Sequence, residues 1–485
     1  MKSYFLSFDL GASSGRAIVT VKEKNSLKLD EVYRFPISTY KKNDTLYWNF
    51  SDIILNIKVG LRNAFAKYPK ILSVGIDTWG VDYGLISHSG ELLSDPISYR
   101  DTRGKTVRDE VYNIISYDDL YCKTGIQYMH FNTIYQLAYD VKNNPELLKK
   151  ADKLLLLPDL IAFFLTGAKR IELTNLSTTN FYDFKKKSII EELEHLGNLF
   201  PEIIYPGETY GIIKTELAKE LGIKQIPVVA VCSHDTASAI LSIPLPRKHI
   251  YISSGTWSLC GTLLKKPITS EMALKENYTN EIGYNHKIRF LKNIMGLWIV
   301  NQCQEKWSEE GKCFTYSELE RMALASKPFM SFIDPDAPVF AEPGNMPAKI
   351  QDYCLVTGQY IPQSIGEIFR CVYQSMAFKY RYVVERLEKI VNYQYKSIVI
   401  VGGGSNIALL NQMTSSATKK DVVIGPQEAS TLGNALILML QANVIGSIEE
   451  GKKLIKNFIG SEKYSPLQED EYDRHYQQFC KIIER

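Results

Sequence analysis

Three aspartates follow short apolar runs in this chain, and their position suggests acid–base chemistry. Asp9, Asp77 and Asp235 end or follow the runs FLSFD, ILSVGID and PVVAVCSHD. In α/β proteins, ligands bind just beyond the carboxyl ends of strands. A carboxylate held there can act as a general base that accepts a proton from a bound hydroxyl group. The three acids are therefore candidate functional residues.

The adjacent pair His234 and Asp235 carries the most chemistry. Asp235 stands at a predicted strand end beside a histidine, so it is our candidate general base. The alternative role is structural, because an aspartate here can cap the helix predicted for ASAILSI by accepting hydrogen bonds from the N–H groups of Ala237 and Ser238. The sequence leaves both roles open.

Two segments, Phe5 to Val19 and Tyr251 to Thr262, read as β-hairpins with turns rich in Gly, Ser and Thr. Such turns expose backbone N–H groups and hydroxyls that can hold phosphate. The repetition indicates two similar halves that close on one nucleotide. In the first hairpin, Asp9 stands where it can hold a magnesium ion through water. The alternative is an ordinary hairpin whose polar residues only satisfy the turn.

The segment after the strand predicted for Ile71 to Asp77 combines an aromatic ring, a glycine and a second acid in the order TWGVD. This combination suits a carbohydrate pocket that needs stacking and hydroxyl recognition. Trp79 can equally belong to the core. The charged segment Tyr99 to Arg103 can face either the sugar or solvent.

A run of three glycines, Gly402 to Gly404, follows the buried strand predicted for Ser397 to Val401, and a helix is expected from about Asn406. Glycines here let the backbone approach a ligand at the start of a helix. The run does not fit the dinucleotide fingerprint, since its last position is Ile407. A tight turn without a ligand is the alternative reading.

The elements that must position these residues fall into two halves. The segment Ile243 to His249, with two prolines and clustered charge, marks a boundary, which predicts domains at 1–243 and 244–485. Helical periodicity predicts a long helix from Ile365 to Val391 in the second half.

Composition excludes several other classes of protein. The chain of 485 residues has a net charge of +3 with interspersed charges, which does not suggest nucleic-acid binding. We find no signal peptide, and the apolar stretch Leu154 to Leu165 is too short to span a bilayer, so a cytoplasmic protein is expected. The 8 cysteines form no metal motif. A disulfide between Cys354 and Cys371 is an open possibility, although a cytoplasmic location favours free thiols.

Taken in order, these motifs resemble the sugar kinases of the FGGY carbohydrate kinase family, within the actin, Hsp70 and hexokinase-like superfamily. The segments GIDTWGVDYGL, KTGIQYMHFNTIYQL, VCSHDTASA, YISSGTWSLCGT, LKNIMGLW, VGGGSN and GPQEASTLGN are similar to the family's rhamnulokinase branch. The match runs from about residue 5 to about residue 440. It implies two ribonuclease-H-like α/β domains with a cleft for ATP and sugar, and phosphorylation of L-rhamnulose at its 1-hydroxyl with ATP and magnesium, in L-rhamnose catabolism.

The resemblance also implies roles for single residues. Asp235 would be the proton acceptor, and Asp9 would hold the metal through water. Residues that would contact the sugar are Gly80, His234, Asp235, Thr236 and Asn293. Residues that would contact ATP are Ala12, Ser13, Ser14, Gly15, Arg16, Thr256, Asn301 and Gly403. The chain departs from the family pattern after GLW, where Asn301 precedes Gln302 at the position of a nucleotide-contacting glutamine.

Two other functions stay open. The chain could phosphorylate another ketose, such as fuculose or xylulose, since the motifs specify the phosphoryl machinery better than the sugar pocket. It could also be a non-catalytic ATP-binding switch, although the presence of both Asp9 and Asp235 argues against that. The expected partners are a small sugar and ATP, with no nucleic acid and no membrane, in a monomer or small homo-oligomer.

Overall fold

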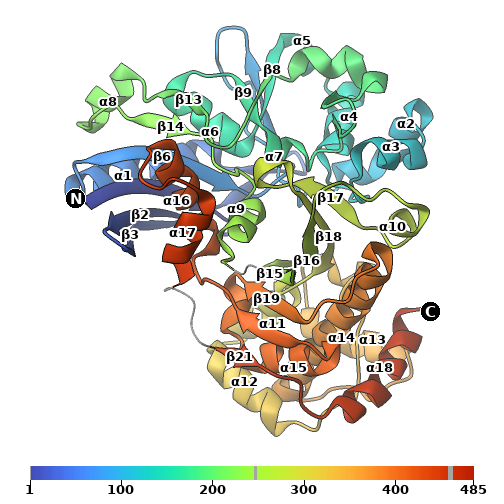
Figure 1. Ribbon diagram of the computed structural model, residues 1–485. Helices are drawn as coiled ribbons and strands as arrows, with labels where there is room; N and C mark the ends of the chain where they lie inside the picture. Colours follow the sequence, from blue (N-terminus) through green and yellow to red (C-terminus); the bar gives the residue numbers. More distant parts are fainter. Residues whose placement is uncertain (1, 245–247, 457–461, 485) are drawn as a thin grey trace. The chain divides into compact units, whose positions relative to one another are not determined.

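The structure is a computed structural model that describes residues 2–244, 248–456 and 462–484 (Figure 1). Its internal contacts define two compact units. Unit 1 comprises Met1–Pro244, Leu263–Phe290 and Glu428–Phe458, and unit 2 comprises Leu245–Thr262, Leu291–Gln427 and Ile459–Arg485. Two segments beyond residue 244 therefore belong to the unit that contains the N-terminal part of the chain. The predicted boundary segment falls partly outside the described residues, at 245–247.

Unit 1 is built on a six-stranded sheet with the order β13-β14-β6-β1-β2-β3. β1 pairs antiparallel with β2 and parallel with β6, which confirms the first predicted hairpin. The strand predicted for residues 227–232 ends earlier, because Ala230 exchanges backbone hydrogen bonds of 2.7 and 2.8 Å with Gly207 and Glu208 instead. The six strands are β1 (Lys2–Leu10), β2 (Ser14–Glu23), β3 (Ser26–Pro36), β6 (Ile71–Thr78), β13 (Thr209–Ile212) and β14 (Pro227–Val229).

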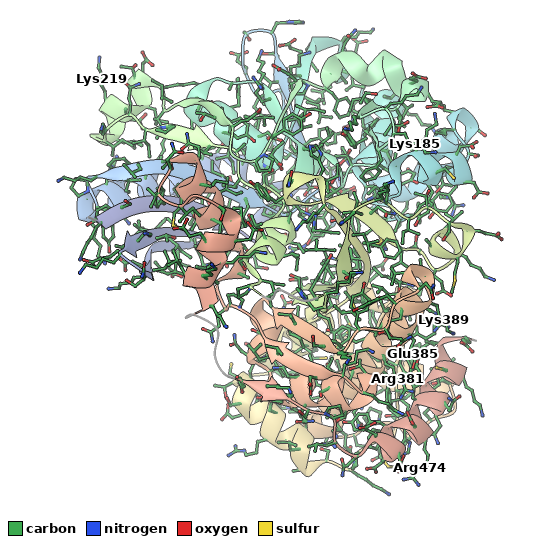
Figure 2. All side chains as sticks on the ribbon, viewed as in Figure 1. Lys185, Lys219, Arg381, Glu385, Lys389 and Arg474 are labelled. Atoms are coloured by element: carbon green, nitrogen blue, oxygen red, sulfur yellow. The ribbon has the colours of Figure 1, made fainter. Side chains whose placement is uncertain are left out.

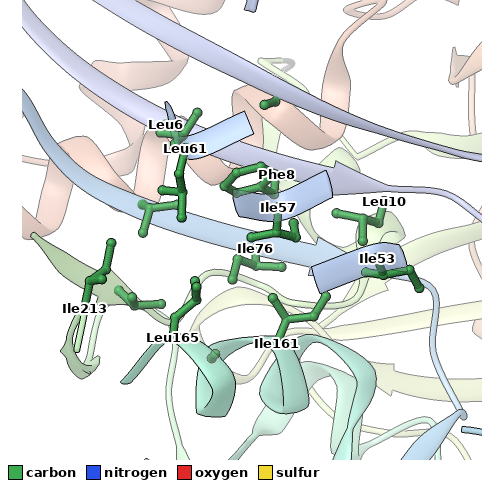
Figure 3. Close-up of a cluster of buried hydrophobic side chains, with 14 of the residues drawn as sticks. Leu6, Phe8, Leu10, Ile53, Ile57, Leu61, Ile76, Ile161, Leu165 and Ile213 are labelled. Carbon is green, nitrogen blue, oxygen red and sulfur yellow. The ribbon is translucent and has the colours of Figure 1, made fainter. Parts of the chain in front are cut away.

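One apolar cluster joins the central strands of this sheet to two helices, α1 (Phe50–Lys67) and α6 (Leu157–Thr166). Alternate residues of β1 share one face, while helix residues four apart share one stripe. These two periods bring Leu6, Phe8 and Leu10 of β1 together with Ile53, Ile57 and Leu61 of α1 (Figure 3). The cluster holds the carboxyl end of β1, and with it Asp9, in a fixed place.

A second apolar cluster contains Phe5, which faces the other side of β1, and side chains of α9 (Asp235–Ser242) and α16 (Ala429–Gln441). The two helices cross closely at Gly433, where an added Cβ would lie 2.0 Å from the carbonyl oxygen of Ser238. This packing explains why the segment from residue 428 onward belongs to unit 1. It also brings α16 to the ends of β1 and β6.

A second sheet has seven strands in the order β17-β18-β16-β15-β19-β20-β21. β15 pairs antiparallel with β16 and parallel with β19, so the second predicted hairpin and the predicted strand at 397–401 are confirmed. The hairpin therefore has the same surroundings as the hairpin of unit 1. The strands are β15 (Ile250–Ser254), β16 (Trp257–Leu264), β17 (Thr279–Ile282), β18 (Ile288–Met295), β19 (Ser397–Val401), β20 (Asp421–Ile424) and β21 (Lys463–Tyr464).

The long helix α14 (Ile365–Val391) has the predicted bounds and begins with a capping box formed by Ser364 and Glu367. Arg381 of α14 donates hydrogen bonds to Glu385 at 2.8 Å and to Asp473 of α18 (Glu469–Ile483) at 2.6 Å. Figure 2 labels the side chains of Arg381 and Glu385. The contact with Glu385 lies within α14, whereas the contact with Asp473 ties α14 to α18. The other helices of unit 2 are α11 (Trp298–Glu309), α12 (Tyr316–Ala325), α13 (Met346–Val356), α15 (Ala408–Thr418) and α18 (Glu469–Ile483).

Shorter elements complete unit 1. They are β4 (Thr39–Lys42), β5 (Thr45–Trp48), β7 (Tyr83–Ser87), β8 (Ala151–Leu156), β9 (Arg170–Glu172), β10 (Tyr182–Asp183), β11 (Ser188–Ile189), β12 (Glu202–Ile204), α2 (Arg108–Ile114), α3 (Tyr117–Thr124), α4 (Thr133–Asn143), α5 (Pro145–Lys150), α7 (Leu173–Leu176), α8 (Thr215–Leu221), α10 (Glu271–Lys275) and α17 (Ile448–Ile455). Of the helices in the described ranges, none has both the length and the apolar character required to cross a bilayer.

Cys354 and Cys371 are buried, and all eight cysteines of the chain are free thiols. The disulfide that the sequence left open is therefore absent. Instead, a hydrogen bond from Cys371 lowers the pKa of the Cys354 thiol, which indicates that the two sulfur atoms lie close together as thiols.

Candidate functional site

The three predicted acids lie close together in unit 1. Asp9 and Asp77 are register partners on the parallel strands β1 and β6. The backbone N–H of Thr78 donates a hydrogen bond of 2.9 Å to the carbonyl of Ser233, which joins the end of β6 to the segment before Asp235. Burial raises the pKa of Asp77 well above its ordinary value, and the charges of Asp9 and Asp235 raise it further. The strand ends thus gather three carboxyl groups, and burial together with the nearby acids favours the protonated form of Asp77.

Asp235 is the first residue of α9, and it does not cap that helix. The N–H groups of Ala237 and Ser238 donate to the backbone carbonyl of His234, at 2.8 and 3.2 Å, rather than to the carboxylate. The helix-cap alternative is therefore wrong. The Asp235 side chain is 31% exposed, and its Oδ1 accepts a hydrogen bond of 2.5 Å from the N–H of Thr236. This leaves the carboxylate accessible to a substrate hydroxyl.

Burial raises the pKa of Asp235 above its ordinary value. The neighbouring His234 lowers this pKa, and the negative charge of Asp9 raises it. A carboxylate with a raised pKa is a stronger base than an exposed one once it is ionised. The electrostatics therefore suit a proton acceptor.

Buried hydrogen bonds anchor the segment that carries His234 and Asp235. The carboxylate of Glu172, at the end of β9, accepts hydrogen bonds from the N–H and hydroxyl of Ser233 at 3.1 and 2.7 Å. It also accepts from Thr174 and from the N–H of Asn175. Sequence reasoning missed Glu172, because nothing in its local pattern distinguishes it from a surface glutamate.

Asp9 forms an ion pair with Arg16, its partner across the β1–β2 hairpin. Arg16 donates to Asp9 Oδ2 at 2.6 Å and also contacts Glu428. The hydroxyl of Thr431, on α16, lies 3.4 Å from the same oxygen of Asp9. Arg16 was predicted to contact ATP phosphates, and here its charge neutralises the predicted metal-holding acid.

The turn of this hairpin presents Ala12, Ser13 and Ser14, and Ser13 is exposed. Packing requires a glycine at position 15, because a Cβ on Gly15 would lie 2.3 Å from the ring of Phe35. Gly15 is buried, so it shapes the hairpin, while the three residues before it are the accessible part of the turn.

Asp77 is fully buried and receives a short hydrogen bond from the side-chain amide of Asn434. The other amide atom of Asn434 accepts from the hydroxyl of Ser238 at 2.6 Å. Asn434 therefore links β6, α9 and α16 beneath the acids. Its role was missed, although the motif GPQEASTLGN contains it together with Glu428 and Thr431.

The segment after β6 is a rigid scaffold. Asp82 is 1% exposed, and its Oδ2 accepts from the indole N–H groups of Trp48 and Trp79 at 2.6 and 2.9 Å. Trp79 thus belongs to the core, as the alternative reading held. Val81 adopts a left-handed backbone with φ of 70°, which is strained for a β-branched residue.

Gly80, the predicted sugar contact in this segment, is half-buried. A Cβ added to it would lie 2.9 Å from the hydroxyl of Thr178 and 3.4 Å from the Asn175 side chain. Any larger residue would therefore disturb the wall that Thr178 and Asn175 form.

In unit 2, the hairpin turn at Gly255 and Thr256 is held by the start of α11. The carbonyl of Thr256 accepts hydrogen bonds of 3.2 Å from the N–H groups of Gly296 and Trp298, and the carbonyl of Gly255 accepts one of 2.9 Å from Leu297. This turn carries no acidic side chain. Its hydroxyl and backbone groups suit phosphate oxygens.

The glycine run packs against the same turn. A Cβ on Gly404 would lie 1.9 Å from the hydroxyl oxygen of Ser254, and a Cβ on Gly402 would lie 2.7 Å from the Ser254 carbonyl. Gly403 has no atom within 4 Å of its Cβ position, so it faces open space. The helix predicted from Asn406 begins as a short 3₁₀ turn at Gly403–Asn406, and α15 follows from Ala408.

Asn293 is half-buried on β18 and Asn301 is exposed on α11. The side-chain oxygen of Asn301 accepts a hydrogen bond of 2.9 Å from Tyr316. Gln302 is 8% exposed. Its side-chain nitrogen donates a hydrogen bond of 2.5 Å to Glu305, and its side-chain oxygen accepts one of 3.4 Å from the N–H of Gly344. Of the two neighbours, Asn301 is the accessible one.

The structure thus brings Asp9, Arg16, His234, Asp235 and Thr236 together in unit 1. Thr256 and Gly403 lie on two packed turns of unit 2. Among the described residues, no three His, Cys, Asp or Glu side chains are grouped to hold a metal ion. A single carboxylate such as Asp9 fits magnesium, which keeps several water and phosphate ligands.

The chain matches sequence profiles of the FGGY family of carbohydrate kinases, the N-terminal domain at residues 4–242 and the C-terminal domain at residues 250–442. A protein named rhamnulokinase from Ligilactobacillus salivarius is 40% identical over 99% of both chains. One of the same name from Bacteroides thetaiotaomicron is 36% identical over 100% of both chains.

Two solved structures share the fold. The ligand-bound xylulose kinase from Lactobacillus acidophilus has a TM-score of 0.80 at 17% identity, covering 99% of this chain and 98% of that one. Plasmodium falciparum glycerol kinase with ADP has a TM-score of 0.78 at 16% identity, covering 100% and 98%. At these identities the likeness establishes the two-domain α/β architecture.

Proposed function

The chain belongs to the FGGY family of carbohydrate kinases, and on this premise we propose that it transfers a phosphoryl group from ATP to the 1-hydroxyl of L-rhamnulose. The observation that carries the choice of sugar is the 40% identity over 99% of the chain to a protein named rhamnulokinase. The product would be L-rhamnulose 1-phosphate, and the reaction would serve L-rhamnose catabolism in the cytoplasm.

Asp235 accepts the proton of the sugar hydroxyl while the hydroxyl oxygen attacks the γ-phosphorus of ATP and ADP leaves. The partly exposed carboxylate with a raised pKa supports this assignment. Gly80, His234, Thr236 and Asn293 orient the sugar in this proposal, so that the reacting oxygen stays beside Asp235.

On the ATP side we assign the turn residues Ala12, Ser13, Ser14 and Gly15, with Arg16, to the phosphates. Thr256, Asn301 and Gly403 would contact the nucleotide from unit 2. Asp9 would hold a magnesium ion through water, and that ion would neutralise the charge developing on the phosphate oxygens. Arg16 then exchanges its ion pair with Asp9 for a phosphate oxygen.

An assay that couples ADP release to NADH oxidation tests the proposal. L-rhamnulose, L-fuculose, D-xylulose and glycerol are supplied separately at equal concentrations with magnesium and ATP, and the Asp235→Asn variant is the control. We expect the highest kcat/KM with L-rhamnulose. A higher value with another ketose would reassign the substrate, and ADP release independent of every sugar would favour the ATP-binding switch.

The remaining proposals concern organisation. We place the boundary between the two family halves near residue 244, dividing the chain into 1–243 and 244–485. We propose a monomer or small homo-oligomer that binds neither nucleic acid nor membrane. Size-exclusion chromatography with light scattering measures the first of these, and retention on heparin or on vesicles tests the second.

A further inference from the structure

A buried ion pair lies directly behind His234. Arg289 is 0% exposed and Glu281 is 5% exposed, and the guanidinium NH2 lies 2.8 Å from Glu281 Oε2. The same NH2 lies 2.8 Å from Nδ1 of His234. Glu281 and Arg289 come from β17 and β18, and all three residues belong to unit 1.

The donor-only chemistry of Arg289 indicates which ring nitrogen of His234 carries the proton. A guanidinium has donors only and stays charged in proteins, so His234 Nδ1 must accept the hydrogen bond from Arg289. The ring proton therefore lies on Nε2, and this atom is 3.5 Å from Oδ1 of Asp235. Glu281 Oε2 also lies 3.4 Å from Nδ1, but a proton placed there would face the Arg289 N–H.

A buried ion pair of this kind contributes little to the stability of the folded protein. Burying two charges costs several kcal/mol, and apolar residues of similar volume often replace such pairs without loss of stability. Among the described residues, Arg289 NH1 and Glu281 Oε2 are both buried without a hydrogen-bond partner, although Arg289 NH2 forms an ion pair with that oxygen. A function for the pair would account for this unfavourable arrangement.

We propose that Glu281 and Arg289 are positioning residues that hold His234 as its Nε2–H tautomer, so that Nε2–H faces Oδ1 of Asp235 at 3.5 Å and Oδ2 is left for the sugar hydroxyl. Arg289 sets the tautomer, and Glu281 holds Arg289. The hydrogen bonds that Thr236 donates to the Asp235 carboxylate support this geometry, because both of them end on Oδ1. The inference deepens the proposed function and rests on it.

The decisive variant replaces both charges, as Glu281→Met with Arg289→Met, so that no unpaired charge stays buried. We expect a folded protein, checked by circular dichroism and the midpoint of thermal unfolding. Its kcat should fall about ten- to hundredfold, as for other groups that act by orienting a reactive ligand, while the KM for the sugar changes little. A folded double variant with kcat within twofold of the parent would overturn the proposal.

The pH dependence of activity distinguishes a positioning role of Glu281 and Arg289 from a merely structural one. Asp235 is faced by His234 and Thr236 from its own segment and by Asp9 from β1, and Asp77 of β6 lies nearby. An N–H group that faces a carboxylate favours its ionised form, so the double variant, in which Nε2–H is no longer held toward Asp235, should lose activity at a higher pH than the parent on the acid side. Arg289→Lys restores one donor and should recover part of kcat.

Nitrogen NMR of the parent protein decides the matter even if the variants do not fold. The chain has 7 histidines, and His234→Gln identifies the signal that disappears. We expect an unprotonated Nδ1 and a protonated Nε2 at neutral pH. The opposite tautomer or a fully protonated ring refutes the inference. Because this measurement needs no sugar, it stands apart from the test of the proposed function, which the sugar panel decides.

Discussion

The two hairpins have the same pairing and different chemistry. β1 pairs antiparallel with β2 and parallel with β6, just as β15 pairs with β16 and β19. In unit 1 the strand ends carry Asp9 and Asp77, and both are buried. In unit 2 the matching ends lead into Ser254 and the glycine run. One scaffold thus serves two tasks, with acids concentrated in one unit and backbone access in the other.

The two sites place different requirements on the residues around them. In unit 1 the acids need partners: Arg16 balances the charge of Asp9, and the neutral amide of Asn434 donates a hydrogen bond to Asp77. In unit 2 the turns need residues without a side chain, because Gly402 and Gly404 lie against Ser254 with no room for a Cβ. Changes of charge should therefore damage unit 1, whereas changes of volume should damage unit 2.

The largest effect is expected from Asp235→Asn. This variant keeps the shape of the side chain but removes the proton acceptor, so kcat should fall by about two to four powers of ten. Binding of sugar and ATP, measured by calorimetry, should change little. The matched control is Asp44→Asn, whose side chain is 97% exposed. Retention of more than about half of the parent's turnover would remove Asp235 from the mechanism.

Asp9→Ala should lower turnover by about a hundredfold, because an ion that stabilises phosphate charge by several kcal/mol loses its anchor. The magnesium concentration for half-maximal activity should rise, while sugar binding stays near that of the parent. A magnesium titration of both proteins measures this. If the two titrations coincide, Asp9 is only a hairpin residue paired with Arg16.

Asp82→Asn should change the pH dependence of stability. Burial raises the pKa of Asp82 to about 6, so the folded protein favours the protonated acid. In the parent, this residue's contribution to the free energy of unfolding is present at low pH and falls by about 2 kcal/mol between pH 4 and pH 6. Urea unfolding at both pH values should show a smaller decrease for the variant. An equal decrease in both proteins would contradict the shifted pKa.

The smallest effect, and the sharpest comparison, comes from neighbouring glycines of unit 2. Gly404→Ala should destabilise the protein by about 1 to 2 kcal/mol, since the added Cβ would overlap the Ser254 side chain. Gly403→Ala faces open space and should leave stability within about 0.5 kcal/mol of the parent. Thermal unfolding measures both, and equal effects would mean that the turn adjusts. A raised KM for ATP in Gly403→Ala would support its predicted contact.

Local sequence patterns predicted the two hairpins, the strands at Ile71 and Ser397, the long helix α14 and the family. These features depend on local signals, since apolar period, turn composition and motif order are all properties of neighbouring residues. The same signals marked Asp9, Asp77 and Asp235 as acids at the ends of strands.

The set of residues that share the site follows from the packing of the folded chain and is not encoded in any local pattern. Glu281 and Arg289 reach His234, and Asn434 reaches Asp77, across long separations in sequence. No local pattern encodes such contacts, because they depend on how β17, β18 and α16 pack in unit 1. The structure also rejected the helix-cap role of Asp235 and the disulfide at Cys354. In each case the competing interactions come from atoms whose proximity exists only in the folded chain.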